Sequence, residues 1–367
     1  MNNQLSPDGE FPACGYGLSG LCCSACLSGP CRISPFDRDA ERGKCGASAD
    51  LLVAGNLLRM IGVDAAGRLA DLAHCVHRVR ATSAGRPAAS PVNPKIAREI
   101  LDKYGLEEAE AGKADGIGRL AGKAEDLLAV NLPARDLSPV WSRLYPENIF
   151  PQFYSGRILP AASLTLVGLS AFQGFHKPDA ARKDILQACL KVALVYMICD
   201  ELIQDLEILQ GGETARGVEN NELKAAETLD PDLPPKGVIM ISTAVQGLDG
   251  LERNSEIFRN QWPGPLVELS RCAGLLAISR QIYRHRSRPP AETEPLVVVF
   301  SASAALVVGT LVCGYTVVSR PGLPLYGSDS IRRFFSEDLR QIFGAVYLPP
   351  EAGDMLSVAQ DYFRKET

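Results

Sequence analysis

The stretch CGYGLSGLCCSACLSGPCRISPFDRDAERGKC, residues 14–45, decides how the N-terminal part of this chain folds. It holds six of the eleven cysteines of the chain, in the spacing C-x7-C-C-x2-C-x4-C-x13-C. Iron–sulfur clusters are bound by cysteine thiolates in groups of four, often with two-residue gaps between close ligands. The spacing therefore predicts iron–sulfur ligation by Cys14, Cys22, Cys23, Cys26, Cys31 and Cys45.

Four of these cysteines form one complete ligand set. Cys23 and Cys26 make a C-x2-C clasp, and Cys31 and Cys45 complete the four. A glycine–proline pair before Cys31 and a glycine after Cys45 supply the turns and close backbone approach that a cluster needs. The alternatives are a structural zinc site, which would leave two thiols idle, and a disulfide framework, which fits a reducing compartment poorly.

Cys14 and Cys22 are left over from this set, and two thiolates cannot fill a four-ligand site. Because Cys22 and Cys23 are adjacent, their side chains are expected to diverge and to serve different clusters. The simplest arrangement is a second cluster on the two-fold axis of a homodimer, with two ligands from each copy. The Cys22-Cys23 dipeptide would then hold two clusters close together, as electron transfer requires.

The whole-chain composition narrows the function classes. The chain has 367 residues, of which 46% are hydrophobic and 22% charged, so it can bury a sizeable core. Its net charge of −5 disfavours nucleic acid as a partner. Residues 1–13 lack a secretory signal pattern, which predicts a cytoplasmic protein. Residues 296–318 carry no charge, but they fit a buried strand, helix and strand better than a membrane span.

Periodicity along the chain predicts the remaining organisation. Helices are expected from residue 49, from Pro94, and over 116–128, 161–172 and 183–209, the last with a bend or break. Strands are expected over 238–243, 296–300, 315–318 and 345–348, with helices over 304–313, 330–343 and 354–364. The predicted fold is mixed α and α/β: an N-terminal iron–sulfur and helical domain, then a small Rossmann-like parallel α/β domain. The expected divisions are 1–83, 84–235 and 236–367.

The stretch GLSGLCCSACLSGPCRI, residues 17–33, resembles the N-terminal cluster motif of nickel-containing carbon monoxide dehydrogenases, members of the hybrid-cluster/prismane superfamily. KCGA at 44–47 and NLLR at 56–59 match the residues that come after that motif in the family. Weaker similarity covers residues 186–206, 323–328 and 337–339. Hybrid-cluster proteins themselves use a different cysteine spacing and fit less well.

This resemblance implies the same division of the cysteines as the spacing does. Cys14 and Cys22 would bind a [4Fe–4S] cluster shared across a homodimer, and the other four would bind an intrachain [4Fe–4S] cluster. The resemblance also implies an oxidoreductase of anaerobic metabolism that exchanges electrons with a ferredoxin or another redox subunit.

The chain departs from the family where nickel would bind. The family holds its nickel–iron–sulfur cluster with one histidine and several cysteines. After residue 236 this chain has only Cys272, Cys313 and His285, and the strand at 238–243 carries no histidine. So few soft ligands cannot assemble such a cluster, so we expect no nickel. Cys75, flanked by His74 and His77 on a helix, is expected to be structural.

Three functions are compatible with these patterns. The first is an iron–sulfur electron-transfer protein without the nickel cluster, a shortened and divergent relative of the family. The second is a compact enzyme that oxidises CO to CO2, with ligands drawn from Cys189, Cys199, Cys272, Cys313 and His285. The third is a non-redox interaction module whose cluster only stabilises the fold. The basic run at 284–288 is either a solvated helix end or a docking patch for an acidic partner.

Overall fold

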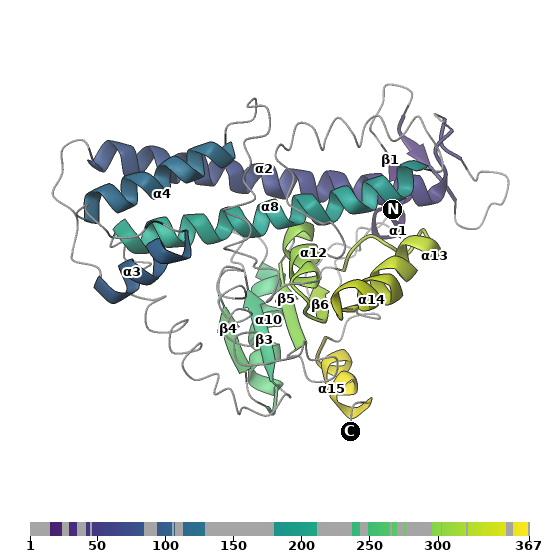
Figure 1. Cartoon of the computed structure of the whole chain (residues 1–367). Coiled ribbons are helices and arrows are strands. Elements are labelled where there is room, and N and C mark those ends of the chain that lie inside the picture. The colour runs from purple at the N-terminus through teal and green to yellow at the C-terminus, as the bar shows by residue number, and fades with distance from the viewer. Residues whose placement is uncertain are drawn as a thin grey trace.

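The computed structural model places a long helical layer above a parallel sheet (Figure 1). The residues described are 15–23, 29–34, 42–44, 46–83, 94–104, 106, 113–128, 180–210, 237–242, 249–264, 266–269, 275, 296–301, 303–320, 322–349 and 355–365. The helix predicted over 161–172 and the boundary predicted near 235 lie outside these residues.

Among the described residues, four helices build the upper layer: α2 (Ala49–Ser83), α3 (Pro94–Lys103), α4 (Lys113–Leu128) and α8 (Ala180–Gln210). α2 and α8 run side by side along much of their length (Figure 1). The helix predicted from residue 49 is confirmed, and Pro94 begins α3, where its fixed φ suits the first turn. α8 is one continuous helix of 31 residues, without the expected break.

Buried polar groups join these helices. Arg68 on α2 forms an ion pair with Asp200 on α8, at 3.2 Å between Nε and Oδ1, and its guanidinium lies over the ring of Tyr196. Directly after α3, the Tyr104 hydroxyl donates a 2.6 Å hydrogen bond to Asp205 on α8. Polar contacts of this kind hold the helices in one register, because misplacing them would leave buried charge without compensation.

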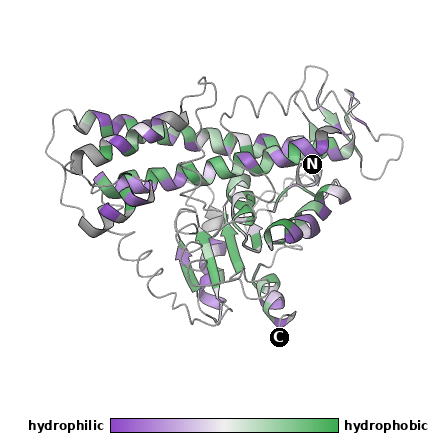
Figure 2. Ribbon diagram, in the orientation of Figure 1, coloured by the Kyte–Doolittle hydropathy of each residue, from purple (hydrophilic) through white to green (hydrophobic). Residues whose placement is uncertain are grey.

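The sheet contains five parallel strands in the order β4-β3-β5-β6-β7. They are β3 (Val238–Ser242), β4 (Leu266–Leu269), β5 (Leu296–Phe300), β6 (Val317–Arg320) and β7 (Tyr347–Leu348). β3 and β5 are apolar along almost their whole length, as Figure 2 shows by colour, because helices cover both faces of the sheet. The predicted mixed α and α/β fold class is therefore confirmed.

Alternate strand residues face opposite layers. Ile239, Val297 and Val299 belong to the core that continues into the helical layer. Val238 and Val298 face the other side, towards α10 (Asp249–Gln261) and α15 (Met355–Lys365). This is the two-residue alternation of β-strands.

α12 (Ala304–Val312) is the buried helix between the sheet and the helical layer, and every one of its residues is buried. It approaches α8 closely at Gly309, where an added Cβ would lie 2.5 Å from Met197 Cγ. The uncharged segment 296–318 is therefore a strand, a helix and a strand inside the core. No helix among the described residues is long and apolar enough to cross a membrane.

The C-terminal part continues as predicted. α13 (Asp329–Arg333), η1 (Phe334–Asp338) and α14 (Leu339–Phe343) follow one another without a break, and η1 is a turn of π-helix. The sequence-based expectation omitted α10 and β4. The divisions at residues 83 and 235 stay predictions.

Candidate functional site: the cysteine segment

The described cysteines of the N-terminal segment lie on a small hairpin. A short helix, α1 (Gly15–Ser19), leads into β1 (Cys22–Cys23), which pairs antiparallel with β2 (Cys31–Arg32). Cys23 lies directly opposite Cys31, so their side chains share one face of the hairpin. Cys22 lies opposite Arg32, and as the neighbour of Cys23 in a strand it points to the other face. The structure thus brings Cys23 and Cys31 together and separates Cys22 from them.

The burial of these side chains differs in the same way. Cys23 and Cys31 are 9% and 7% exposed, whereas Cys22 is half-buried. Cys14, Cys26 and Cys45, the other three predicted ligands, lie outside the described residues. Within the described residues no group of three or more His, Cys, Asp or Glu could hold a metal ion, and the predicted four-cysteine set falls only partly inside them.

The two buried sulfurs accept hydrogen bonds from nitrogen donors. The Lys44 backbone N–H donates to Cys31 Sγ at 3.4 Å, and the Arg59 guanidinium donates to Cys23 Sγ at 3.5 Å. Cysteine sulfurs that bind iron–sulfur clusters accept hydrogen bonds, and these bonds help to set the properties of the cluster. The donor set at Cys23 and Cys31 therefore fits an iron–sulfur cluster.

The first turns of α2 hold the hairpin in place. The Ser48 hydroxyl accepts a hydrogen bond from the Leu51 N–H and caps the helix at its start. Two turns later the Asn56 amide donates to the carbonyl oxygens of Gly20 and Cys22, both at 2.7 Å. Asn56 Oδ1 in turn accepts from Arg59 at 2.9 Å. Backbone carbonyls beside the cysteines are thus tied to a rigid helix.

A loop from the other end of the chain closes the segment. The Gly327 N–H donates to the Ser19 carbonyl at 2.8 Å. Gly20 adopts a left-handed φ of +73°, and an added Cβ there would lie 2.5 Å from the Pro324 carbonyl oxygen. The backbones therefore approach more closely than any side chain would permit.

Asp50, in the first turn of α2, reinforces this junction. It accepts hydrogen bonds from Ser328 and Ser330, both at 2.6 Å, and from Arg182 on α8 at 3.1 Å. Burial opposes the ionisation of Asp50, but these hydrogen bonds and the charge of Arg182 together hold its pKa below 3.8. Three parts of the chain thus meet beside the cysteine segment.

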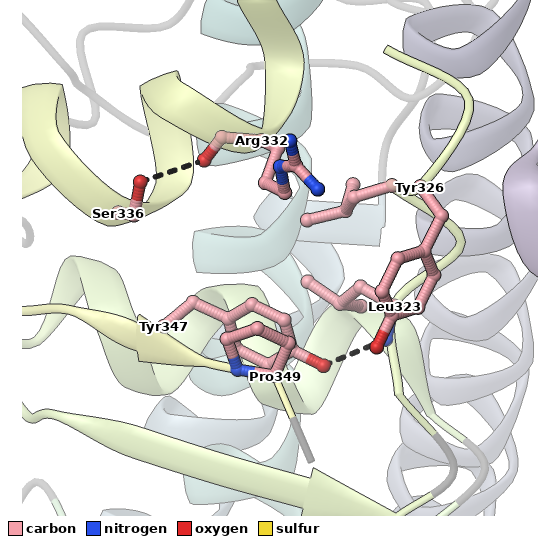
Figure 3. A pocket seen from close by; sticks show the side chains of 7 residues that line it. Leu323, Tyr326, Arg332, Ser336, Tyr347 and Pro349 are labelled. Carbon is pink, nitrogen blue, oxygen red and sulfur yellow. Dashed lines mark hydrogen bonds between the residues drawn. The ribbon is translucent and has the colours of Figure 1, made fainter. Parts of the chain in front are cut away.

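The same loop lines a small pocket on its other side (Figure 3). Burial raises the pKa of Tyr347, whose oxygen accepts a hydrogen bond from the Leu323 N–H at 2.8 Å. The pocket volume is about 160 Å³, which is small beside the roughly 300–1,000 Å³ of typical ligand pockets. Its lining residues are Leu323, Leu325, Tyr326, Arg332, Ser336, Tyr347 and Pro349.

The remaining described cysteines are packed as small apolar side chains. Cys75 is 1% exposed while its neighbours His74 and His77 point to solvent, so the three do not share a face. Cys189 and Cys199 on α8 are fully buried. Burial raises the pKa of both thiols, and for Cys199, with the nearby charge of Asp200 adding to it, to about 12. Without a metal such thiols stay protonated at neutral pH, as expected for cysteines that pack as small apolar side chains.

Two more candidates from the sequence, Cys272 and His285, lie outside the described residues, and Cys313 is buried at the end of α12. Sequence reasoning assigned no role to Asn56 and Arg59. A signal was present, because they are a polar i, i+3 pair within an otherwise apolar stretch of helix.

Comparisons with known proteins identify the family of this chain. The model of the Prismane/CO dehydrogenase family matches residues 21–222. Carbon monoxide dehydrogenase 1 of Methanosarcina acetivorans is 30% identical over 169 residues, which is 44% of this chain and 26% of that protein. Carbon monoxide dehydrogenase of Rhodospirillum rubrum is 52% identical over 68 residues, 18% of this chain and 10% of that protein. In sequence, the chain thus matches about a quarter of the first of these relatives.

Among solved structures, carbon monoxide dehydrogenase IV from Carboxydothermus hydrogenoformans has a similar fold. The TM-score is 0.72 at 13% identity, and the superposition covers 97% of this chain and 94% of that chain. At this identity the likeness concerns the fold alone.

Proposed function

The chain belongs to the Prismane/CO dehydrogenase family, and we propose that within it this protein is an iron–sulfur electron-transfer protein. Cys23, Cys26, Cys31 and Cys45 hold an intrachain [4Fe–4S] cluster. Cys14 and Cys22 hold a second [4Fe–4S] cluster together with the same two cysteines of another copy. Each cluster, when bound, supplies a one-electron couple. The nickel-containing active-site cluster is absent.

The observation that carries this proposal is the pair of buried sulfurs on the hairpin. Cys23 and Cys31 face the same side, and each accepts a hydrogen bond from a nitrogen donor. A zinc site would use the same donor atoms, but it would leave Cys14 and Cys22 without a role. The family match, which begins at residue 21, supports iron–sulfur ligation over zinc.

The shared cluster is supported by the placement of Cys22. It is adjacent to Cys23 but points to the opposite, more exposed side of the hairpin. A half-buried ligand at the surface can be completed by a second copy, which predicts a homodimer. The main-chain link between Cys22 and Cys23 then sets the two clusters close enough for electron exchange.

The described contacts beyond the carboxyl end of β5 fit the proposed absence of nickel. Open parallel sheets bind ligands at the carboxyl ends of strands, where the strand order reverses. Here that point lies between β3 and β5. Beyond the carboxyl end of β5, the carboxylate of Asp64 on α2 accepts hydrogen bonds from the Ser303 hydroxyl and the Ala305 N–H, at 3.1 and 3.0 Å. The two described side chains there, Asp64 and Ser303, are thus bound to each other.

An acidic electron carrier such as a ferredoxin is the partner that suits the exposed cations described in the cysteine segment. Arg32, Arg42 and Lys44 of the cysteine segment all reach the surface. A positive rim around a redox centre steers a negatively charged carrier to it and raises the association rate. Another redox subunit with an acidic face would bind in the same way.

The test is to purify the chain without oxygen and to measure iron, sulfide and nickel per chain. The proposal predicts about six irons per chain, because one cluster is held whole and the other is shared. It also predicts a dimer by analytical ultracentrifugation and no CO-dependent reduction of viologen. A preparation holding zinc and no sulfide would contradict it, and so would a monomer with both clusters intact.

The family match favours one other candidate, a compact carbon monoxide dehydrogenase. Nickel near one per chain together with CO-dependent viologen reduction would establish that function instead. Clusters that bind but neither reduce nor reoxidise, and whose removal only unfolds the chain, would indicate a structural role.

A further inference from the structure

Arg59 and Asn56 lie one turn apart on α2, beneath the Cys22-Cys23 dipeptide. We propose that Arg59 raises the reduction potential of the intrachain cluster through its hydrogen bond to the Cys23 sulfur. Asn56 is the positioning residue that fixes both Arg59 and the Cys22 backbone. This inference rests on the proposed function, because it requires a cluster on Cys23.

The geometry singles out Arg59. Its Nη2 lies 3.5 Å from Cys23 Sγ, within hydrogen-bonding reach of a sulfur acceptor, while its Nη1 is held by Asn56 Oδ1 at 2.9 Å. The guanidinium is planar and always charged, so fixing one nitrogen orients the other. Arg32, the other arginine next to a cysteine, is exposed, and its guanidinium lies over the Tyr16 ring.

The direction of the effect follows from charge. Reduction adds one negative charge to a cluster, so a cation beside a ligand sulfur stabilises the reduced form more than the oxidised form. Cluster potentials depend on net charge, on hydrogen bonds to the sulfurs and on solvent exposure. Because Cys23 is only 9% exposed, solvent screens the interaction weakly. Removing the charge of Arg59 therefore lowers the potential.

The polar atoms of Asn56 are all used at this junction. Its amide nitrogen donates to the carbonyls of Gly20 and Cys22, and its oxygen accepts from Arg59. The side chain therefore couples the backbone of Cys22, assigned to the shared cluster, to the cation that contacts Cys23. Its effect on the potential is transmitted through Arg59.

The test measures midpoint potentials of the anaerobically purified full chain, by redox titration followed by electron paramagnetic resonance. In Arg59→Met we expect the ratio of reduced to oxidised intrachain cluster at a fixed poise to fall about tenfold. For a one-electron couple this is about 59 mV. Arg59→Lys, which keeps the charge but loses the planar fork, is expected to shift less. Asn56→Ala should shift in the same direction, and adding it to Arg59→Met should change nothing further.

Arg78→Met is the matched control, because it removes an arginine from the same helix about 28 Å further along at 1.5 Å per residue. Arg78 contacts Glu207 at 3.6 Å and is half exposed. The midpoint potential of the Arg78→Met variant should equal that of the unmodified chain. If Arg59→Met does not retain its iron, Arg59→Leu, likewise neutral and without a hydrogen-bond donor, replaces it in the same comparison.

The outcomes separate the two proposals. An unchanged potential in a neutral Arg59 variant with full iron content overturns the role of Arg59 and leaves the proposed function standing. An equal shift in Arg78→Met overturns it too, since the effect would then be one of overall charge. An unmodified chain that binds no iron–sulfur cluster overturns the proposed function and the role of Arg59 together.

Discussion

Replacing Gly20 with alanine tests whether the C-terminal loop truly closes the cysteine segment. Gly20 has a φ of +73°, and an added Cβ would lie 2.5 Å from the Pro324 carbonyl oxygen and 3.2 Å from Val53 Cγ2. Gly344, after α14, offers a matched control. Its φ is +74°, but an added Cβ there would meet nothing within 4 Å. The two sites share the backbone conformation and differ in the contact.

The expected loss of folding free energy has two contributions, the left-handed backbone conformation and the contact that the added Cβ makes. A left-handed conformation costs a residue with a Cβ about 1–2 kcal/mol, and this applies equally to both glycines. Forcing an extra carbon into a packed site costs about 1–3 kcal/mol more, and this applies only to Gly20, because a backbone carbonyl cannot rotate away as a side chain could. We therefore expect Gly20→Ala to lose about 2–5 kcal/mol and Gly344→Ala about 1–2 kcal/mol.

The assay is unfolding by denaturant, followed by circular dichroism on anaerobic protein, with iron per chain measured in parallel. Gly20→Ala should lose iron as well as stability, since Gly20 is two residues from Cys22 and its carbonyl is bound by Asn56. Gly344→Ala should keep its iron. Equal losses of free energy in the two variants would refute the close approach of the 322–328 loop to Gly20.

Three other predictions concern the buried charges and thiols. The folded pKa of Asp50 is lowered, so its contribution to stability is full above its unfolded pKa of 3.8 and is lost as pH falls through the folded value. Burial outweighs the hydrogen bonds to Asp64 and raises its pKa. The contribution of Asp64 to stability is therefore full below pH 3.8, and it is lost as the pH rises through the pKa of the folded chain. Urea unfolding from pH 3 to 7 should give Asp50→Asn and Asp64→Asn stability differences from the unmodified chain with opposite slopes, and slopes of one sign would contradict this. Arg68→Met leaves the carboxylate of Asp200, which is 1% exposed, without its cation and should cost about 3–5 kcal/mol in denaturant unfolding. Adding Asp200→Leu should recover part of that loss, and a further loss would argue against the ion pair. Cys199, with its pKa of about 12, should resist iodoacetamide at pH 8 until guanidinium unfolds the chain, as read by mass spectrometry, and labelling of the folded chain would count against its burial.

Much of the fold could be predicted from local pattern, because the long elements carry strong periodicity. α2, α8 and the segment 296–318 have apolar residues at most of their buried positions, so their type and approximate bounds follow from sequence. α10 and β4 gave no such signal. α10 is strongly polar, with Phe258 its main buried apolar residue, and β4 has only four residues, of which Leu269 alone is fully buried. Their positions are determined by tertiary contacts, because β4 pairs with β3 and α10 packs against the sheet.

The candidate site divides in the same way. The proposed ligand type and grouping rest on spacing alone, because cluster ligands are close in sequence. The groups that support them do not, because they come from distant positions. Asn56 lies 34 residues from the Cys22 carbonyl that it binds, and Ser328 lies 278 residues from Asp50. No local pattern reveals such pairs. The close approach of the two segments, together with the left-handed φ of Gly20, explains why Gly20 and Gly327 are glycines.

These distant contacts also show what the parallel sheet contributes to the cysteine segment. The cysteine hairpin is too short to fold alone, since β1 and β2 each contain two residues. Two hydrogen bonds hold the backbone just before it, one from the Asn56 amide on α2 to the Gly20 carbonyl and one from the Gly327 N–H to the Ser19 carbonyl. The loop that carries Gly327 is in turn set by β6 and by the N-terminal cap of α13, where Ser328 also binds Asp50. The sheet therefore has a structural function at the cysteine segment that is independent of any chemistry at its own edge.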